Sequence, residues 1–134
     1  MSIKTIENSI ITQLQNNVSD LKIEGFPDKP ADYQLLHSKG AVLVHFQGAT
    51  YNEPEETVFT QQDVTLEFGI TLLIKGLRDK NGAYTYIDTI ISTLTGYSPT
   101  GCNKMYPVKV DFLAEKEGIW QYTLSFSVPT ENFS

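Results

Sequence analysis

Apolar residues recur at intervals of three and four at the start of the chain, which places them on one stripe of a helix. The stripe consists of Ile3, Ile6, Ile10, Leu14, Val18 and Leu21. Residues 25–30 then contain a glycine and two prolines, which cannot continue a helix. The pattern therefore predicts an amphipathic helix over residues 3–21, followed by an irregular loop.

Later stretches have the pattern of β-strands. Residues 41–46 form a nearly continuous apolar run between Gly40 and Gly48, as expected for a strand covered on both faces. Strict alternation over residues 64–74 and 120–128 predicts two long strands, each with one buried face. Those buried faces would consist of Val64, Leu66, Phe68, Ile70, Leu72, Ile74, Trp120, Tyr122, Leu124, Phe126 and Val128. A further strand begins around residues 108–112, and the polar residues 115–117 before Gly118 predict a hairpin turn into the last strand.

The segment between the two long strands has helical spacing and is followed by Gly96, a residue type that commonly ends a helix. Its β-branched residues and the preceding Asn81-Gly82 pair would also suit a strand hairpin. Periodicity favours the helix, because the spacing is shared by Tyr84, Ile87, Ile90, Ile91 and Leu94. The order of elements predicts an α+β fold, with two helices packed on a mainly antiparallel sheet.

The composition is that of one folded domain over residues 1–134, with 40% hydrophobic and 19% charged residues. A net charge of −6 argues against general electrostatic binding to nucleic acid or anionic lipid. Cys102 is the only cysteine, so no internal disulfide can form. The first residues turn polar too soon for a signal peptide, and no apolar run approaches the roughly 18 residues of a membrane span. We therefore expect the protein to be made and used in a cytoplasm, or as part of a particle assembled there.

No residue pattern predicts a catalytic centre, a metal site or a cofactor. His45 lies in an apolar strand, where a packed or hydrogen-bonded histidine is commoner than a ligand, and His37 has no partner at metal-ligand spacing. One cysteine beside two histidines leaves a Cys/His nucleophile as an open but weaker alternative. The acids Glu53, Glu55 and Glu56 lack the spacing and turn glycine of a calcium loop and favour a solvated loop.

Over nearly its whole length the chain resembles the tail terminator family of phage Mu-like contractile tails. The matching segments are, in order, residues 40–44, 48–51, 65–75, 77–78, 82–84, 94–97, 101–102, 105–107 and 118–122. The most specific part joins Gly101-Cys102 and Met105-Tyr106-Pro107 to the strand that contains Trp120. The chain is more distantly similar to the terminators of long non-contractile tails.

This resemblance implies a structural protein without catalysis, from a phage, a prophage or a tail-derived particle. It implies a hexameric ring that caps the tail tube, stops tube polymerisation and offers a surface for head–tail joining. The implied partners are further copies of the chain, the tail tube protein and the head–tail connector protein, with DNA passing through without specific binding. Assembly would take place in the host bacterial cytoplasm and involve no membrane.

A ring uses two different patches of each subunit, and loops rich in aromatic residues, proline and glycine are the candidates. The residues predicted to contact another subunit or the tube are Tyr51, Glu53, Glu55, Glu56, Tyr97, Pro99, Lys104, Met105 and Tyr106. Packing under the loop is an equally open interpretation of Tyr97, Met105 and Tyr106.

Two other functions stay open. One is a small-ligand or peptide-binding module with a closed apolar pocket near Trp120, and the other is a hydrolase that uses Cys102 and a histidine.

Overall fold

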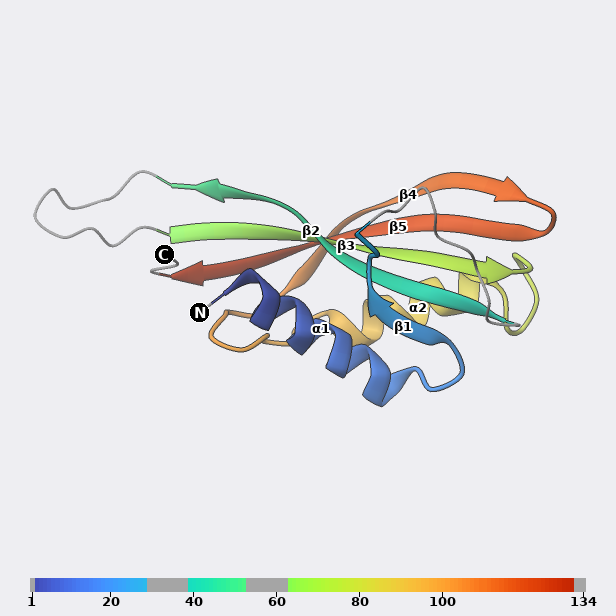
Figure 1. The fold of residues 1–134 in the computed structure, drawn as a ribbon, viewed down its shortest axis with the longest axis horizontal. Helices are drawn as coiled ribbons and strands as arrows, with labels where there is room; N and C mark the ends of the chain where they lie inside the picture. Colours follow the sequence, from blue (N-terminus) through green and yellow to red (C-terminus); the bar gives the residue numbers. More distant parts are fainter. Residues whose placement is uncertain (1, 29–38, 53–62, 132–134) are drawn as a thin grey trace, which may run out of the picture.

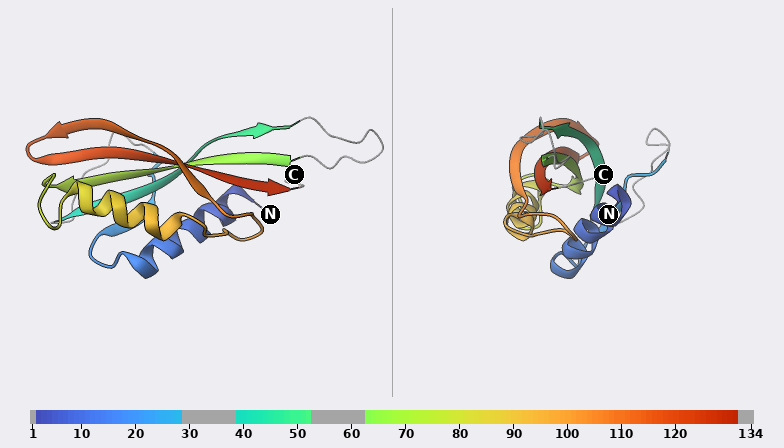
Figure 2. Two further views of the ribbon diagram at one scale, coloured as in Figure 1. Left: turned by 180° about the vertical axis from the view of Figure 1, so that it is seen from behind. Right: turned by 90° about the vertical axis from the view of Figure 1, so that its left-hand side faces the viewer.

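The computed structural model describes residues 2–28, 39–52 and 63–131. In chain order the elements are α1 (Ile3–Asn17), β1 (Lys22–Gly25), β2 (Gly40–Tyr51), β3 (Asp63–Lys75), α2 (Ala83–Leu94), β4 (Tyr106–Lys116) and β5 (Ile119–Glu131). The five strands form one sheet in the order β1-β2-β3-β5-β4. The sheet is strongly twisted, and both helices lie on the same side of it (Figures 1 and 2). The predicted α+β fold is confirmed, with one parallel pair, β1 and β2, in an otherwise antiparallel sheet.

The main core lies between the two helices and the sheet. α1 contributes Ile6, Ile10 and Leu14, and α2 contributes Ile90 and Leu94, all with no exposed surface. The strands supply alternate residues to the same cluster: Val42, Val44, Val64, Leu66, Phe68, Ile70, Leu72, Ile74, Leu124, Phe126 and Val128. Burying one such side chain is worth about 1.5–3 kcal/mol, so this layer holds the helices on the sheet.

The first helix is shorter than its apolar stripe predicted. Ser2 begins it by accepting a hydrogen bond from the Thr5 N–H at 3.1 Å, and Val18 ends it in extended backbone. Val18 and Leu21 are nevertheless buried, because the chain turns back along the sheet as it enters β1. The prediction of an irregular loop missed β1, whose four residues are too few to show a strand period. β1 forms because its backbone pairs in parallel with residues 41–44 of β2.

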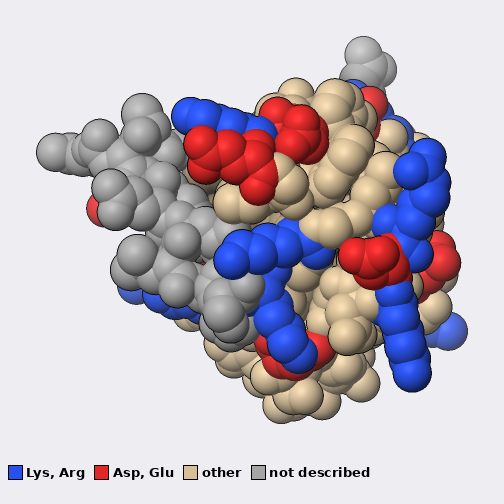
Figure 3. Space-filling model, turned by 90° about the vertical axis from the view of Figure 1, so that its right-hand side faces the viewer, with Lys and Arg blue, Asp and Glu red and all other residues tan. Residues whose placement is uncertain are grey.

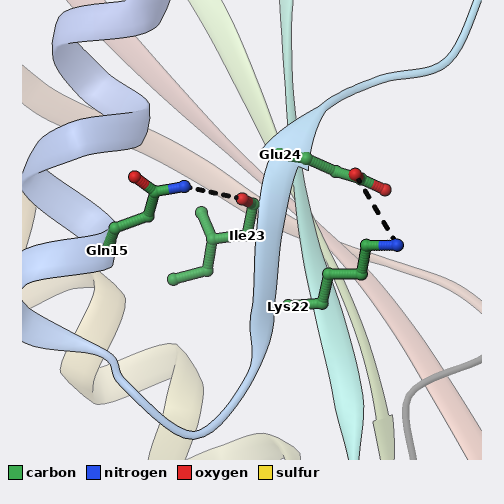
Figure 4. A network of polar contacts seen from close by, with 4 residues as sticks. All are labelled: Gln15, Lys22, Ile23 and Glu24. Atoms are coloured by element: carbon green, nitrogen blue, oxygen red, sulfur yellow. Dashed lines mark hydrogen bonds and ion pairs between the residues drawn. The ribbon is translucent and has the colours of Figure 1, made fainter.

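A side chain of α1 fastens β1 to the helix layer. The Gln15 Nε2 donates a hydrogen bond to the Ile23 carbonyl oxygen at 3.0 Å, as Figure 4 shows. On the same strand Lys22 and Glu24 form a long ion pair of 3.9 Å in solvent. An exposed pair of this kind adds little stability, so the amide contact is the more important of the two.

The long strands differ from their predicted burial at particular positions. β2 does not end at Gly48 but continues through a bulge beside that residue to Tyr51. β3 and β5 bury parts of their second faces as well, including Thr71, Leu73, Ser125 and Ser127. Trp120 and Tyr122 are only half-buried instead of lying in the core, because they adjoin β4 at the edge of the sheet. Alternation in the sequence cannot predict burial of a strand's second face, since that burial depends on which other residues pack against the strand.

Both local turn predictions are confirmed. Residues 83–94 form α2 and not a hairpin, and Gly96 follows the helix with φ 84°. At the other turn Glu117 has φ 54° and Gly118 has φ 82°, the two positive values of the tight turn that joins twisted antiparallel strands. The Gly118 N–H also donates to a Glu115 carboxylate oxygen at 2.9 Å. This turn positions β4 against β5.

Candidate assembly surface

The loop between α2 and β4 is tied down at both ends. The Gly96 N–H donates to the Met105 carbonyl at 2.9 Å, and the Met105 N–H donates to the Tyr97 carbonyl at 2.8 Å. The Tyr97 hydroxyl lies 2.7 Å from the Ser9 hydroxyl on α1, and the Asn103 N–H donates to the Pro129 carbonyl on β5. The loop is therefore a fixed part of the surface at the end of the helix layer.

Three of the predicted contact residues in this loop have another role in the structure. Met105 is 1% exposed and belongs to the core, and Pro99 is also buried. Tyr97 is half-buried and holds α1 through its hydroxyl. Packing within the chain, the alternative interpretation of Tyr97 and Met105, therefore accounts for both of these side chains, and burial accounts for Pro99 as well.

The other predicted contact residues divide into exposed ones and ones that fall outside the described residues. Tyr106 is exposed at the start of β4, Lys104 is exposed in the loop before it, and Tyr51 is exposed at the end of β2. Glu53, Glu55 and Glu56 lie outside the described residues. The structure thus leaves predicted contact residues exposed at two places that are far apart in the sequence.

The most exposed apolar surface is strand β4 itself. Of the seven large hydrophobic residues that are exposed in the described parts of the chain, five lie on this strand. They are Tyr106, Val108, Val110, Phe112 and Leu113, with exposed fractions of 40–56%. Figure 1 shows β4 at the outer margin of the sheet. Sequence reasoning assigned this strand to a pair and missed that no other described strand pairs with its outer edge.

Two bulges in β4 spread its apolar side chains over both faces. The register with β5 shifts at Val108 and again at Leu113, so each of these is an extra residue. Val110 and Phe112 pair with Leu124 and Tyr122 and share their helix-bearing face. There the Phe112 ring lies 5.6 Å from the Tyr122 ring and 6.0 Å from the Trp120 ring. Through these ring contacts the apolar surface of β4 continues onto the neighbouring strand β5.

A groove lies on the opposite face of the sheet. It has a volume of about 480 Å³ and is lined by Phe26, Pro27, His45, Thr71, Leu113 and Thr123. The His45 ring packs edge-on against Phe26 at 5.1 Å, and burial lowers the pKa of its imidazole. Its Nδ1 is buried without a hydrogen-bond partner in the described parts of the chain. Trp120 does not line this open groove, which therefore differs from the closed pocket near Trp120 expected of a ligand-binding module.

The environment of Cys102 is unfavourable to a nucleophilic thiolate. Burial raises the pKa of its thiol, and its sulfur faces the Thr100 carbonyl at 3.7 Å. His45 lies in the groove on the other face of the sheet, and His37 falls outside the described residues. The hydrolase alternative therefore gains no Cys–His pair from the residues described.

Charges of both signs gather at the end of the molecule that carries the β4–β5 turn (Figure 3). Lys75 and Lys116 both pair with Ile119 in the sheet, and the Lys75 N–H donates to the Lys39 carbonyl. Lys39 forms an ion pair with Asp20 at 3.8 Å. Charges of opposite sign therefore lie close together at this end. Neither described helix has the length and hydropathy needed to cross a bilayer.

Comparison with known proteins gives one family and one fold. The family model described as Gp37 protein matches residues 10–133. A chain from the solved structure described as the virion of a native gene transfer agent (GTA) particle superposes with a TM-score of 0.64. The match covers 96% of each chain at 13% sequence identity, which shows a shared fold. No match was found among curated protein sequences.

Proposed function

This chain belongs to the Gp37 protein family, which is phage-associated, and from that premise we propose that it is a structural component of a phage tail or tail-derived particle. More specifically, it acts as a tail terminator. A ring of six copies caps the finished tail tube, prevents further tube subunits from adding and offers its other side to the head–tail connector protein. The role requires contact surfaces and no catalysis.

The observation that carries this proposal is the fold likeness to a chain of a gene transfer agent virion, which spans 96% of both chains. A likeness of this extent leaves no large part of either chain for an unrelated domain. The resemblance of residues 94–107 and 118–122 to Mu-like terminators supports the finer role. The open strand β4 adds a physical argument, because an exposed apolar edge suits a subunit that is completed by its neighbours.

The charge distribution is compatible with a ring through which DNA passes. With a net charge of −6, the subunit has no overall attraction for phosphate, so DNA can move through the bore without being held. The mixed charges at the β4–β5 end suit contact with another protein. Assembly in the host cytoplasm follows from the same role, and the finished protein stays in the particle.

The test combines solution mass with a tube-capping assay. The protein is measured by native mass spectrometry over a range of concentrations, alone and after mixing with polymerising cognate tube protein. We expect species of six times the chain mass, bound at tube ends in negative-stain micrographs, and shorter tubes than in mixtures without the protein. A chain that stays monomeric in both settings and leaves tube length unchanged would contradict the proposal.

A further inference from the structure

Three stretches of strand lie at the edges of the sheet, and one of them is covered. β1 has only four residues, and α1 reaches it through the hydrogen bond from Gln15 to the Ile23 carbonyl (Figure 4). Short and covered edges are the usual protection against pairing with another chain. β1 is therefore a closed edge, which leaves β4 and the far half of β2 as the other two edges of the sheet.

β4 is an open edge that carries both apolar and charged side chains. Over residues 106–116 its inner side pairs with β5, and no other described strand pairs with its outer side. Lys109 and Asp111 on this strand form an ion pair with each other at 3.5 Å, so their charges offset one another. Its exposed side chains include Val110 and Phe112. Backbone groups beside exposed apolar side chains form a template for strand addition.

The second open edge is the far half of β2. β1 pairs with residues 41–44 of β2, and just beyond β1 the Phe26 N–H donates to the Val44 carbonyl at 2.8 Å. From His45 to Tyr51 no described strand pairs with the outer side of β2. Ala49, Thr50 and Tyr51 are exposed there. Figure 1 shows this stretch running past the end of β1.

The two open edges have matching polarity. Each step in the order β2-β3-β5-β4 is antiparallel, so β4 runs opposite to β2. A second copy in the same orientation, placed beside β4, would present its own β2 antiparallel to that strand. Because the edges are different and lie on opposite sides of the sheet, the contact is head-to-tail and can close into a ring.

We propose that β4 of one copy pairs antiparallel with residues 45–51 of β2 in a second copy, so that the sheet continues from subunit to subunit. The occupant is a second copy because the chain itself carries the complementary edge. Gly48 is level with Tyr106 across β3 and β5, so the open stretches are offset along the strands. Neighbouring copies would therefore be staggered, as strands are in a closed barrel. The inference rests on the proposed ring and names the contact that builds it.

The test places a charge on each open edge separately. Val110→Lys blocks the β4 edge and Ala49→Lys blocks the β2 edge, while Ser92→Lys on the exposed side of α2 is the matched control. Circular dichroism and urea unfolding confirm that each variant folds. We expect both edge variants to need at least tenfold more protein than wild type to assemble, with the control unchanged. If the isolated wild type is monomeric, binding at tube ends replaces solution mass as the measure.

A mixture of the two edge variants distinguishes this contact from others. Each variant keeps the edge that the other has lost, so an isotope-labelled mixture should give dimers of one copy of each and no ring. Pairing between two β4 edges would instead give dimers of Ala49→Lys alone and would overturn the proposal. Rings that form as readily from Val110→Lys as from wild type would also overturn it while leaving the terminator role intact. A wild type that assembles neither alone nor on tubes removes both.

Discussion

Neighbouring residues of the same loop can have opposite surroundings. Met105 is 1% exposed, whereas Tyr106, the next residue, is 50% exposed. The backbone explains the difference, since Met105 is held by hydrogen bonds to Gly96 and Tyr97 and Tyr106 begins an edge strand. Aromatic and apolar content therefore marked this loop as a candidate contact region but could not say which of its side chains faces solvent. The orientation of a loop side chain depends on the groups to which the loop backbone is hydrogen-bonded.

Tyr86 gives a residue-level prediction with a clear pH dependence. Its hydroxyl donates a hydrogen bond to the Asp20 carboxylate, and burial, then that bond and the carboxylate charge, raise the pKa of Tyr86 from 10.0 to about 12. Between these values the folded state keeps a proton that the unfolded state releases. The stabilisation is therefore complete below pH 10 and is lost as the pH rises through 12.

The measurement is the free energy of unfolding in urea, for the wild type and Tyr86→Phe, from pH 8 to 12. At pH 8 the variant should be less stable by about 1–3 kcal/mol, because a hydrogen bond to a charged group is lost. Above pH 10 the wild type should lose stability relative to the variant. A difference that stays constant to pH 12 would show that Tyr86 titrates as in the unfolded chain.

At the level of elements, local signals predicted the turns well and the strand edges poorly. The glycine after α2 and the polar residues before Gly118 act through their own backbone angles, which a sequence shows directly. β1 and the extension of β2 to Tyr51 depend on partners elsewhere in the chain. Strand pairing is non-local, so the sequence of one strand alone does not determine how many of its residues are paired.

The β4–β5 turn gives a prediction with a matched control. Gly118 has φ 82° and Gly48 does not have positive φ, and an added Cβ would meet nothing within 4 Å at either position. Gly118→Ala should therefore lower the free energy of unfolding by about 1–2 kcal/mol through backbone strain alone. Gly48→Ala should be neutral or stabilising by about 0.5 kcal/mol. Thermal unfolding of monomeric protein measures both, and equal effects would contradict the role of the positive φ.

At the level of the whole molecule, one sheet runs from end to end and both helices share a single core with it (Figures 1 and 2). Within the described residues, the helices and the sheet thus form one core. This arrangement also separates the covered side of the sheet from the open β4 edge. Stability within the chain and contact with other copies would then use different surfaces.

A single core predicts a single cooperative unfolding transition. Far-ultraviolet circular dichroism reports the helices and strands, and fluorescence reports Trp120, the only tryptophan, on β5 beside the open edge. The two urea transitions of the monomeric protein should coincide. An early fluorescence transition would instead mean that the β4–β5 hairpin unfolds separately from the helix layer.

The sequence by itself determined the two helices, the long strands β3 and β5 and the turn at Gly118, because periodicity and backbone preference are local properties. It also marked the loop before β4 as a candidate contact surface. Only the tertiary structure decided that Met105 and Pro99 are buried, that β1 joins the sheet and that β4 has an edge with which no described strand pairs. An edge exists only where no neighbouring strand is present, and neighbours are set by the packing of the whole chain.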